Sequence, residues 1–478
     1  MLWSSAAAHT VRSLRSSASR ASRSVVSIGR SLACGLMAAG MLSGAASAQV
    51  TVQTLIGKAV TDDTHNADVG NAITRFRDRD IDGCRALLER VRSEDPKVPP
   101  PGVMMATLWL GVTQVPAART ELDLTATKFP DDPEAYLILA DLAFQERHVT
   151  DAAVLFERAT ALTEAFEGNA KRKRDFQIRC HAGLAAVAEA RSEWDRALEH
   201  IQAWVDIDPD SSSARQRLGS ALFQLDKPEE SLAAFREARK LDENLLQPEL
   251  LLARLYDQAR KADKARTLVE EAVKRAGEDV NVRIGAANWF LSHGDTAAAR
   301  ENAEAALELD PKSLDARLIN GTIARVLRDF DLAEKFFSEA HTQSPRSFPA
   351  ADSLAVVLAE SSDKEKLQQA LELAETNLAM VKDNQQLQLA TATTLAWVYY
   401  KLGRMADAEK ILAQVAQNNA LTADGAYYIA RILNDKGEKE QARRLLQQVM
   451  ANEPMFANRV AAEQLLETLV GGADPAGK

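Results

Sequence analysis

Residues 294–345 decide the fold, and they read GDTAAARENAEAALELDPKSLDARLINGTIARVLRDFDLAEKFFSEAHTQSP. Small residues and a proline from the first half of this stretch return at one constant spacing in the second half, in the pairs Ala299 and Ala333, Ala306 and Ala340, and Pro311 and Pro345. A fixed period of about 34 residues is the signature of stacked supersecondary units. The stretch therefore predicts a repeat architecture wherever the chain keeps this period.

The period extends in both directions from Ala299. Steps of 34 residues lead to further small residues: Cys84, Ala118, Ala152, Ser231, Ala265, Ala408 and Ala442. A longer step before Ala197 and an irregular unit around Ala370 interrupt the series. An apolar residue commonly follows each of these positions at i+4, and a small residue follows at i+7. Such spacings place the residues on one stripe of a helix.

Each unit contains a second small residue, twelve positions before the first, with apolar neighbours at helical spacing. This pattern predicts two helices per unit. Gly294, Gly403 and Gly437 fall between the two helices, where glycine permits a tight turn. One helix pair cannot bury its own apolar stripe, so the pairs must stack. The sequence therefore predicts an all-α solenoid of antiparallel helix pairs.

This pattern resembles the tetratricopeptide repeat family over roughly residues 65–456, and Ala152, Phe156 and Ala159 form one of its clearest instances. The family's Trp near the start of each first helix is missing. The resemblance implies a right-handed superhelical solenoid. We expect this domain over residues 65–470, with about eleven helix pairs and a capping helix over 457–469, a linker over 49–64 and a tail over 471–478.

Two insertions interrupt the period. Eleven extra residues near 167–177 include Lys171-Arg172-Lys173-Arg174 and are expected to extend a helix or a loop. This basic run is interpreted either as a docking site for an acidic partner or lipid headgroups, or as a solvated helix face. The second insertion accompanies a helix that is predicted to begin late, at Lys364.

Residues 1–48 have the composition of a targeting segment. They contain five Arg and no Asp or Glu, then an apolar run from Leu32 to Ala46 and the small-residue site Ala46-Ser47-Ala48. These features predict a secretory signal peptide and export to the periplasm or the medium. The alternative is a mitochondrial transit peptide, which is also rich in Arg and Ser. No later segment has the ~18 apolar residues of a transmembrane helix, so no membrane span is expected in the mature chain.

The sequence offers no catalytic motif. It lacks a Gly-rich phosphate loop, His-Glu-x-x-His, Gly-x-Ser-x-Gly and Cys-x-x-Cys. Beyond residue 48 only Cys84 and Cys180 remain, too few for a disulfide framework or a zinc site. The net charge of −10 does not favour nucleic-acid binding. We therefore expect a protein that is not an enzyme, with no catalytic residues, metal site, cofactor or nucleic-acid partner.

Binding is the function that the pattern supports, because stacked helix pairs form a concave surface lined by their first helices. The sequence predicts a non-catalytic scaffold that holds a protein or peptide there. The alternative is a structural spacer, or an assembly or oligomerisation component of a cell-envelope or secretion machine. The positions expected to face the partner are Trp397, Tyr400, Tyr427, Arg431, Arg254, Asn288 and Arg325.

Trp397, Tyr400, Tyr427 and Tyr428 form the densest aromatic cluster in a chain with only 5% aromatic residues. They are interpreted either as anchors of a peptide groove or as packing between repeats, and both interpretations stay open. Some members of the family hold a peptide's terminal carboxylate with a Lys/Asn clamp. The resemblance does not extend to that clamp, because the corresponding inward positions are Leu250, Ile284, Leu318 and Thr393.

Overall fold

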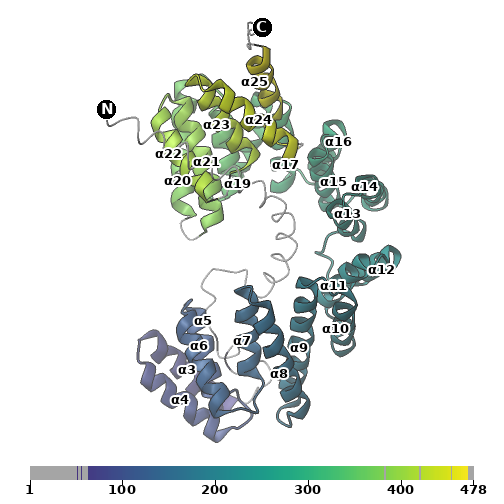
Figure 1. The fold of residues 1–478 in the computed structure, drawn as a ribbon, viewed down its shortest axis with the longest axis vertical. Helices are drawn as coiled ribbons and strands as arrows, with labels where there is room; N and C mark the ends of the chain where they lie inside the picture. Colours follow the sequence, from purple (N-terminus) through teal and green to yellow (C-terminus); the bar gives the residue numbers. More distant parts are fainter. Residues whose placement is uncertain are drawn as a thin grey trace, which may run out of the picture. The chain divides into compact units, whose positions relative to one another are not determined.

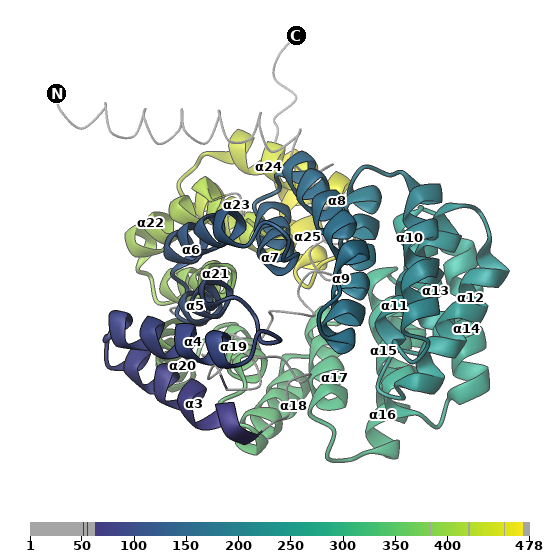
Figure 2. The same cartoon turned by 90° about the horizontal axis from the view of Figure 1, so that it is seen from below.

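The computed structural model describes residues 63–381, 384–418, 421–453 and 455–471, together with Thr51 and Leu55. The described residues form twenty-three α-helices and no strand (Figures 1 and 2), which confirms the predicted all-α class. The predicted signal peptide, most of the predicted linker and residues 472–478 of the predicted tail lie outside the described residues.

The chain divides into two compact units, and the division falls between Leu255 and Tyr256. We call the described residues up to Leu255 the N-terminal unit. Its helices form successive pairs: α3 (Asp63–Arg77) and α4 (Ile81–Glu94), α5 (Pro101–Gly111) and α6 (Val115–Lys128), α7 (Glu134–Gln145) and α8 (Val149–Ala165), α9 (Ala170–Ala190) and α10 (Trp194–Ile207), α11 (Ser212–Gln224) and α12 (Pro228–Leu241). The next helix, α13 (Pro248–Gln258), contains the division.

The described residues from Tyr256 onward form the C-terminal unit. After α14 (Ala262–Ala276), its helices are again paired: α15 (Val280–Ser292) and α16 (Thr296–Leu309), α17 (Leu314–Val326) and α18 (Phe330–Gln343), α19 (Phe348–Leu358) and α20 (Lys364–Met380), α21 (Gln385–Lys401) and α22 (Met405–Gln417), α23 (Ala423–Asp435) and α24 (Lys439–Asn452). A single helix, α25 (Arg459–Gly471), follows the last pair. The helix-pair solenoid predicted from the period is thereby confirmed.

Ten turns between successive helices of the described chain, including the turn from α13 to α14, share one geometry. The second residue after the first helix has a positive φ, between 57° and 82°, at Arg79, Thr113, Arg147, Ser192, Asp226, Arg260, Gly294, Arg328, Gly403 and Gly437. The following amide then donates to the carbonyl five positions earlier, as from Asp295 N to Phe290 O at 2.9 Å. This is the six-to-one bond that closes a Schellman turn. The turn between α19 and α20 shows no such residue.

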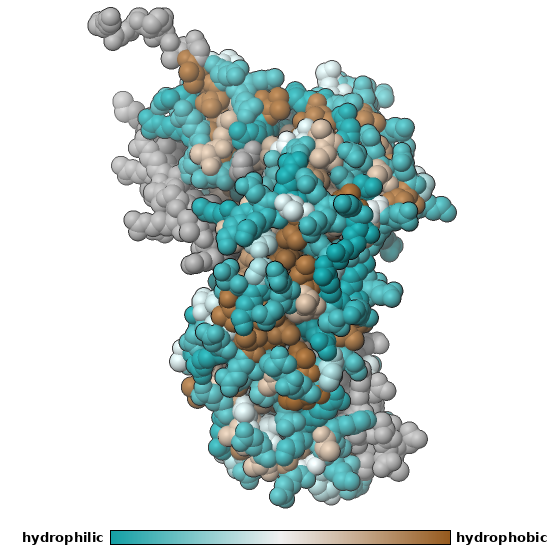
Figure 3. All heavy atoms as spheres, turned by 90° about the vertical axis from the view of Figure 1, so that its right-hand side faces the viewer, coloured by the Kyte–Doolittle hydropathy of each residue, from teal (hydrophilic) through white to brown (hydrophobic). Residues whose placement is uncertain are grey.

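The stripe of small residues predicted from the period is the buried stripe of each second helix. Ala299, Ala333 and Ala340 are fully buried, and the Phe337 side chain is only 1% exposed. Gly321 on α17 lies directly against that ring, because a Cβ at this position would be 2.6 Å from Cε1 of Phe337. Small residues therefore let neighbouring helices approach to close-packed contact. Figure 3 shows hydrophilic side chains over much of one face, broken by patches of apolar residues.

The two insertions have different structural outcomes. The first extends a helix, since α9 has 21 residues and begins at Ala170 with the Asn169 side chain as its N-cap. The second accompanies α20, which begins at Lys364 as predicted. Within the basic run, Lys171 and Arg174 are exposed. Arg172 departs from both interpretations of the run, because it is only 5% exposed and packs inside the N-terminal unit.

Candidate functional site

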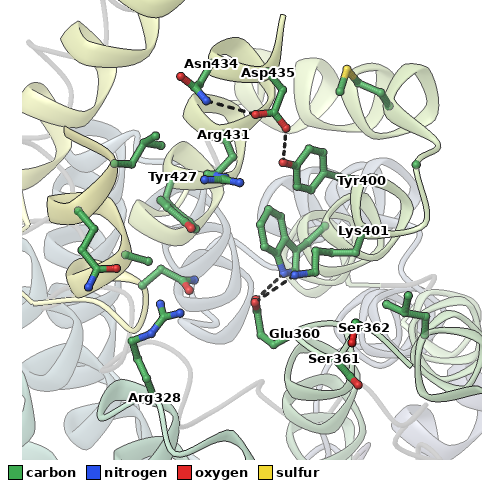
Figure 4. A pocket seen from close by; sticks show the side chains of 18 of the residues that line it. Arg328, Glu360, Ser361, Ser362, Tyr400, Lys401, Tyr427, Arg431, Asn434 and Asp435 are labelled. Carbon is green, nitrogen blue, oxygen red and sulfur yellow. Dashed lines mark hydrogen bonds and ion pairs between the residues drawn. The ribbon is translucent and has the colours of Figure 1, made fainter. Parts of the chain in front are cut away.

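An open pocket of about 910 Å³ lies on the C-terminal unit. Its walls come mainly from α21, α23 and α25, from the loop after α19 and from the turn after α17 (Figure 4), and Leu367 on α20 and Met405 on α22 complete them. Most of these elements are the first helices of their pairs or the turns that directly follow them. The pocket therefore occupies the side of the unit that the sequence predicts as a binding surface.

The base of the pocket is the aromatic cluster. The Trp397 ring stacks on Tyr428 with centroids 4.1 Å apart and on Tyr400 at 5.0 Å. Its indole Nε1 donates a hydrogen bond of 2.8 Å to Glu360, in the loop after α19. Trp397 is only 3% exposed and Tyr427 only 7%. Most of the surface of Trp397 and Tyr427 is therefore used in packing between α21 and α23, while their edges line the pocket.

The acidic side chains of the pocket have partners within the protein. Glu360 accepts from Trp397 and also forms an ion pair of 3.3 Å with Lys401. Asp435 accepts a 2.5 Å hydrogen bond from the Tyr400 hydroxyl. Burial and this bond to Asp435 both raise the pKa of Tyr400. The phenol thus stays protonated and remains a donor.

Two arginines of the pocket lack a carboxylate partner. Arg328 and Arg431 both line it, and neither forms an ion pair with any of the described residues, although Arg431 contacts the Tyr400 hydroxyl. Figure 4 shows the Tyr427 side chain between the two guanidinium groups. Burial raises the pKa of Tyr427 to about 12, and the positive charges of Arg431 and Arg328 act against that rise. Both cations thus favour the ionised form of the same phenol, although burial outweighs them.

Arg325, one of the predicted contact residues, has an internal partner. Its guanidinium forms a 3.0 Å ion pair with Asp424, in the first turn of α23. Asp424 also accepts from the backbone N and the side-chain Nδ2 of Asn458, at 2.9 and 2.8 Å. This network joins α17, α23 and the start of α25, so Arg325 helps to hold the unit together.

Asp352 on α19 lies near this network. One of its carboxylate oxygens, Oδ2, accepts a 3.1 Å hydrogen bond from Thr394, while Oδ1 is buried without a partner among the described residues. Burial raises the pKa of Asp352 to about 6, although Thr394 and Arg325 act in the opposite direction. Folding therefore makes ionisation of Asp352 costly, although at pH 7, which is above this pKa, the carboxylate is still mostly ionised.

We expect Asp352→Asn to stabilise the C-terminal unit at pH 7 by about 1–3 kcal/mol. The amide oxygen can still accept from Thr394, and the buried charge is removed. Because the pKa is raised on folding, the charge destabilises progressively as the pH rises from about 4 to 6. The gain in the urea midpoint should thus be present at pH 7 and small at pH 4. Asp331→Asn, at an exposed position of α18, is the control and should show no such pH dependence. An equal gain at both pH values would contradict this account.

The remaining predicted contact residues are not part of the pocket lining. Arg254 is exposed on α13. Asn288 is exposed on α15, where its Nδ2 donates to Ile284 O at 2.9 Å. Only Trp397, Tyr400, Tyr427 and Arg431 of the predicted set line the pocket.

The lining residues that sequence reasoning missed include Arg328, the Glu360–Lys401 pair, Asp435 and the face of α25 that contains Gln464. One signal for Arg328 was present. Arg328 lies 34 residues after the turn residue Gly294, which is the spacing between Ala299 and Ala333. The period that locates the glycine therefore also locates this arginine in a turn.

Tertiary packing also joins two histidines that the sequence places in different helices. Nδ1 of His181 on α9 and Nδ1 of His200 on α10 are 3.3 Å apart. Burial lowers the pKa of both imidazoles. Among the described residues, no group of three or more His, Cys, Asp or Glu side chains is arranged to hold a metal ion. No helix in the described part of the chain is long and apolar enough to cross a membrane.

The chain is similar to known proteins at the level of its repeats. The tetratricopeptide repeat model matches residues 103–170, 182–245, 284–348 and 393–454. No curated protein sequence matches the chain. Similar solved structures include the APC/C hetero-tetramer Cut9–Hcn1, which is 14% identical in sequence and has a TM-score of 0.38. The match covers 85% of this chain and 97% of that chain. The yeast Tom70 structure has 13% identity, 86% and 97% coverage and a TM-score of 0.35.

A tetratricopeptide repeat protein from Parabacteroides merdae has 16% identity, with 62% of this chain and 99% of that chain covered and a TM-score of 0.32. Identity is low in all three comparisons, so the assignment rests on the family model. That model covers more than half of the 478 residues, in the same helix pairs that the repeat period marks. The chain belongs to the tetratricopeptide repeat family.

Proposed function

We propose that this protein is a non-catalytic scaffold that binds a protein partner in the pocket of its C-terminal unit. The tetratricopeptide repeat fold generally serves as a scaffold for protein–protein interaction. The observation that carries the proposal is the pocket itself. Two cationic side chains that form no ion pair with a described carboxylate, Arg328 and Arg431, line this pocket together with packed aromatic rings. Aromatic and arginine side chains are the residue types that most often contribute the largest share of the binding energy at protein interfaces.

The pocket is large enough for a segment of a partner rather than for a single side chain. Its volume of about 910 Å³ is at the upper end of the range of about 300–1,000 Å³ that is usual for ligand sites. Its walls are helices whose positions are held by the Arg325–Asp424–Asn458 network and by the Trp397–Glu360 hydrogen bond. A partner segment would therefore meet a preorganised surface, which reduces the entropy cost of binding.

Site-specific photocrosslinking tests this proposal. A photoreactive phenylalanine analogue replaces Gln464, which is exposed on α25 and lines the pocket. A matched chain carries the same group at Lys410, which lies on α22 and is not part of the lining. We expect a specific adduct in a native extract from position 464 and none from 410. Arg431→Glu should abolish that adduct without changing the helical circular dichroism. Equal adducts from both positions, or an adduct that Arg431→Glu leaves intact, would refute the pocket as the binding site.

The choice of variants follows from burial. Trp397→Ala is a poor probe of binding because the side chain is almost fully buried and its loss would disturb packing. Arg431 is only partly buried, so a change there tests contact with the partner more directly.

A further inference from the structure

We propose that the partner segment is acidic, and that an Asp or Glu side-chain carboxylate of the partner is held between Arg328 and Arg431. This inference rests on the proposed function and adds the chemical class of the segment. It follows from which charged groups of the pocket are already paired within the protein and which are not.

The pairing is asymmetric. Both acidic side chains of the pocket are engaged, Glu360 by Trp397 and Lys401, and Asp435 by Tyr400. Among the described residues, Arg328 and Arg431 have no carboxylate within ion-pair distance. The groups that remain for a ligand are therefore mainly donors with positive charge. A site of this kind favours a ligand that supplies acceptors and negative charge.

Some other arginines of the C-terminal unit form ion pairs with carboxylates of the same unit. Arg266 pairs with both Glu270 and Asp295, and Arg404 pairs with Asp407. The whole chain carries a net charge of −10, so acidic groups are in excess. Arg300 and Arg346 of the same unit also form no ion pair with the described residues, so what distinguishes Arg328 and Arg431 is that both line the same pocket.

The Tyr427 hydroxyl defines where the carboxylate would bind. It lies between the two guanidinium groups in Figure 4 and has no hydrogen-bond partner among the described residues. A carboxylate accepts up to about four hydrogen bonds, and a guanidinium presents its donors as a planar fork that matches it. A carboxylate bound beside Tyr427 could accept from this phenol and from the guanidinium groups on either side of it.

The backbone at Arg328 permits a clean test. Arg328 is the turn residue after α17 and has φ of 62°, a conformation that glycine adopts without strain. Arg328→Gly therefore removes the guanidinium without straining the backbone, but it also removes the contact of that group with the Phe330 ring, 5.3 Å from its centroid, so unchanged helical circular dichroism of the variant is required as well. Arg260→Gly is the matched control, because Arg260 occupies the same turn position after α13, has φ of 57° and does not line the pocket.

The experiment measures fluorescence anisotropy with three labelled probes and the full chain. The first is a short Glu/Ala peptide with an amidated C terminus, the second is the same peptide with Gln in place of Glu, and the third is the Gln peptide with a free terminal carboxylate. We expect the Glu peptide to bind at least about tenfold more tightly than either Gln peptide, since a hydrogen bond to a charged group has an effect of this size. Arg328→Gly and Arg431→Gln should each weaken the Glu peptide by about tenfold. Arg260→Gly should have no effect.

Several results would overturn the inference. Equal affinity for the Glu and amidated Gln peptides, or no measurable binding of either, would exclude an acidic segment. Preference for the free terminal carboxylate alone would reassign the site to a chain end. Equal losses of affinity for the Glu peptide in Arg328→Gly and Arg260→Gly would show that the loss does not come from the pocket. A dimer that Arg328→Gly dissociates would assign the pocket to a second copy of the chain.

Failure here and failure of the proposed function are distinguishable. Photocrosslinking at position 464 does not depend on the charge of the partner. An adduct that depends on Arg431, together with equal affinity for the Glu and Gln peptides, would support the pocket as a binding site and contradict only the acidic segment.

Discussion

Replacing Arg172 with Ala is expected to lower the free energy of unfolding of the N-terminal unit by about 3–5 kcal/mol. The Arg172 side chain is 6% exposed, and its Nη2 lies 2.5 Å from Glu134 and 3.3 Å from Asp132. Nη1 donates to Lys97 O at 3.3 Å. The guanidinium also lies over the Phe166 ring, 5.5 Å from its centroid. One side chain thus joins α9 to α7 and to the loop before α5.

The size of the effect follows from what the substitution leaves behind. Asp132 is 8% exposed, so without Arg172 its buried charge loses its ion-pair partner and keeps only the Glu134 amide, at 3.0 Å, and the more distant charge of Arg92. An uncompensated buried charge is far more costly than the loss of an exposed ion pair, for which the usual cost is about 0–1 kcal/mol. Glu134 loses its partner as well, but it is 19% exposed and can be partly hydrated.

Hydrogen exchange on α7 and α9 measures this effect, because exchange should accelerate most in the helices that Arg172 joins. Lys171→Ala is the control, since Lys171 is the exposed neighbour in the same basic run. It should change stability by less than about 0.5 kcal/mol. In the Asp132→Asn background, Arg172→Ala should cost less, because no second buried charge remains. A small effect of Arg172→Ala on its own would show that the ion pairs do not stabilise this unit.

Phe337→Ala should destabilise the C-terminal unit by about 3–5 kcal/mol. The Phe337 ring is 1% exposed on α18 and is in contact with Gly321 on α17. Its removal leaves a cavity in the core of this helix pair, since the surrounding helices are held by the repeats on either side. The urea midpoint measures the loss. Leu332→Ala, at a position of the same helix that is 37% exposed, is the control and should cost much less.

The contact with Gly321 adds a test with a definite sign. Gly321→Ala alone should destabilise by about 1–3 kcal/mol, because the new methyl group would lie 2.6 Å from the ring. When Phe337→Leu is also present, the methyl group has room, and the two changes together should cost less than the sum of the separate costs. Costs that simply add would show that the two side chains do not share this space.

Much of the architecture could be predicted from the sequence because helical periodicity is a local property. The constant spacing that relates Ala299 to Ala333 located the second helix of each pair, and both residues are buried there. The turn at Gly294 could be predicted for the same reason. At Arg328 the turn has the same backbone without a glycine, so the residue type alone did not reveal it.

The candidate site could be predicted only in part. The sequence located Trp397, Tyr400, Tyr427 and Arg431 on one face of two successive first helices, and these four line one pocket. It left open whether the aromatic residues bind or pack. Burial of Trp397 and Tyr427 shows that most of their surface is used in packing, while the pocket edges of both remain candidates for contact.

The sequence by itself determined the helices, their pairing and the stripe of small residues that each pair buries, because these depend on neighbours a few positions away. Only the tertiary structure decided which charges are paired. Arg325 meets Asp424 across 99 positions of the chain, and Arg172 reaches Lys97 across 75. The burial and the partners of a charge depend on helices that are distant in sequence. For this reason Arg325 became a structural residue, while Arg328, a few positions further along, lines the pocket without a carboxylate partner among the described residues.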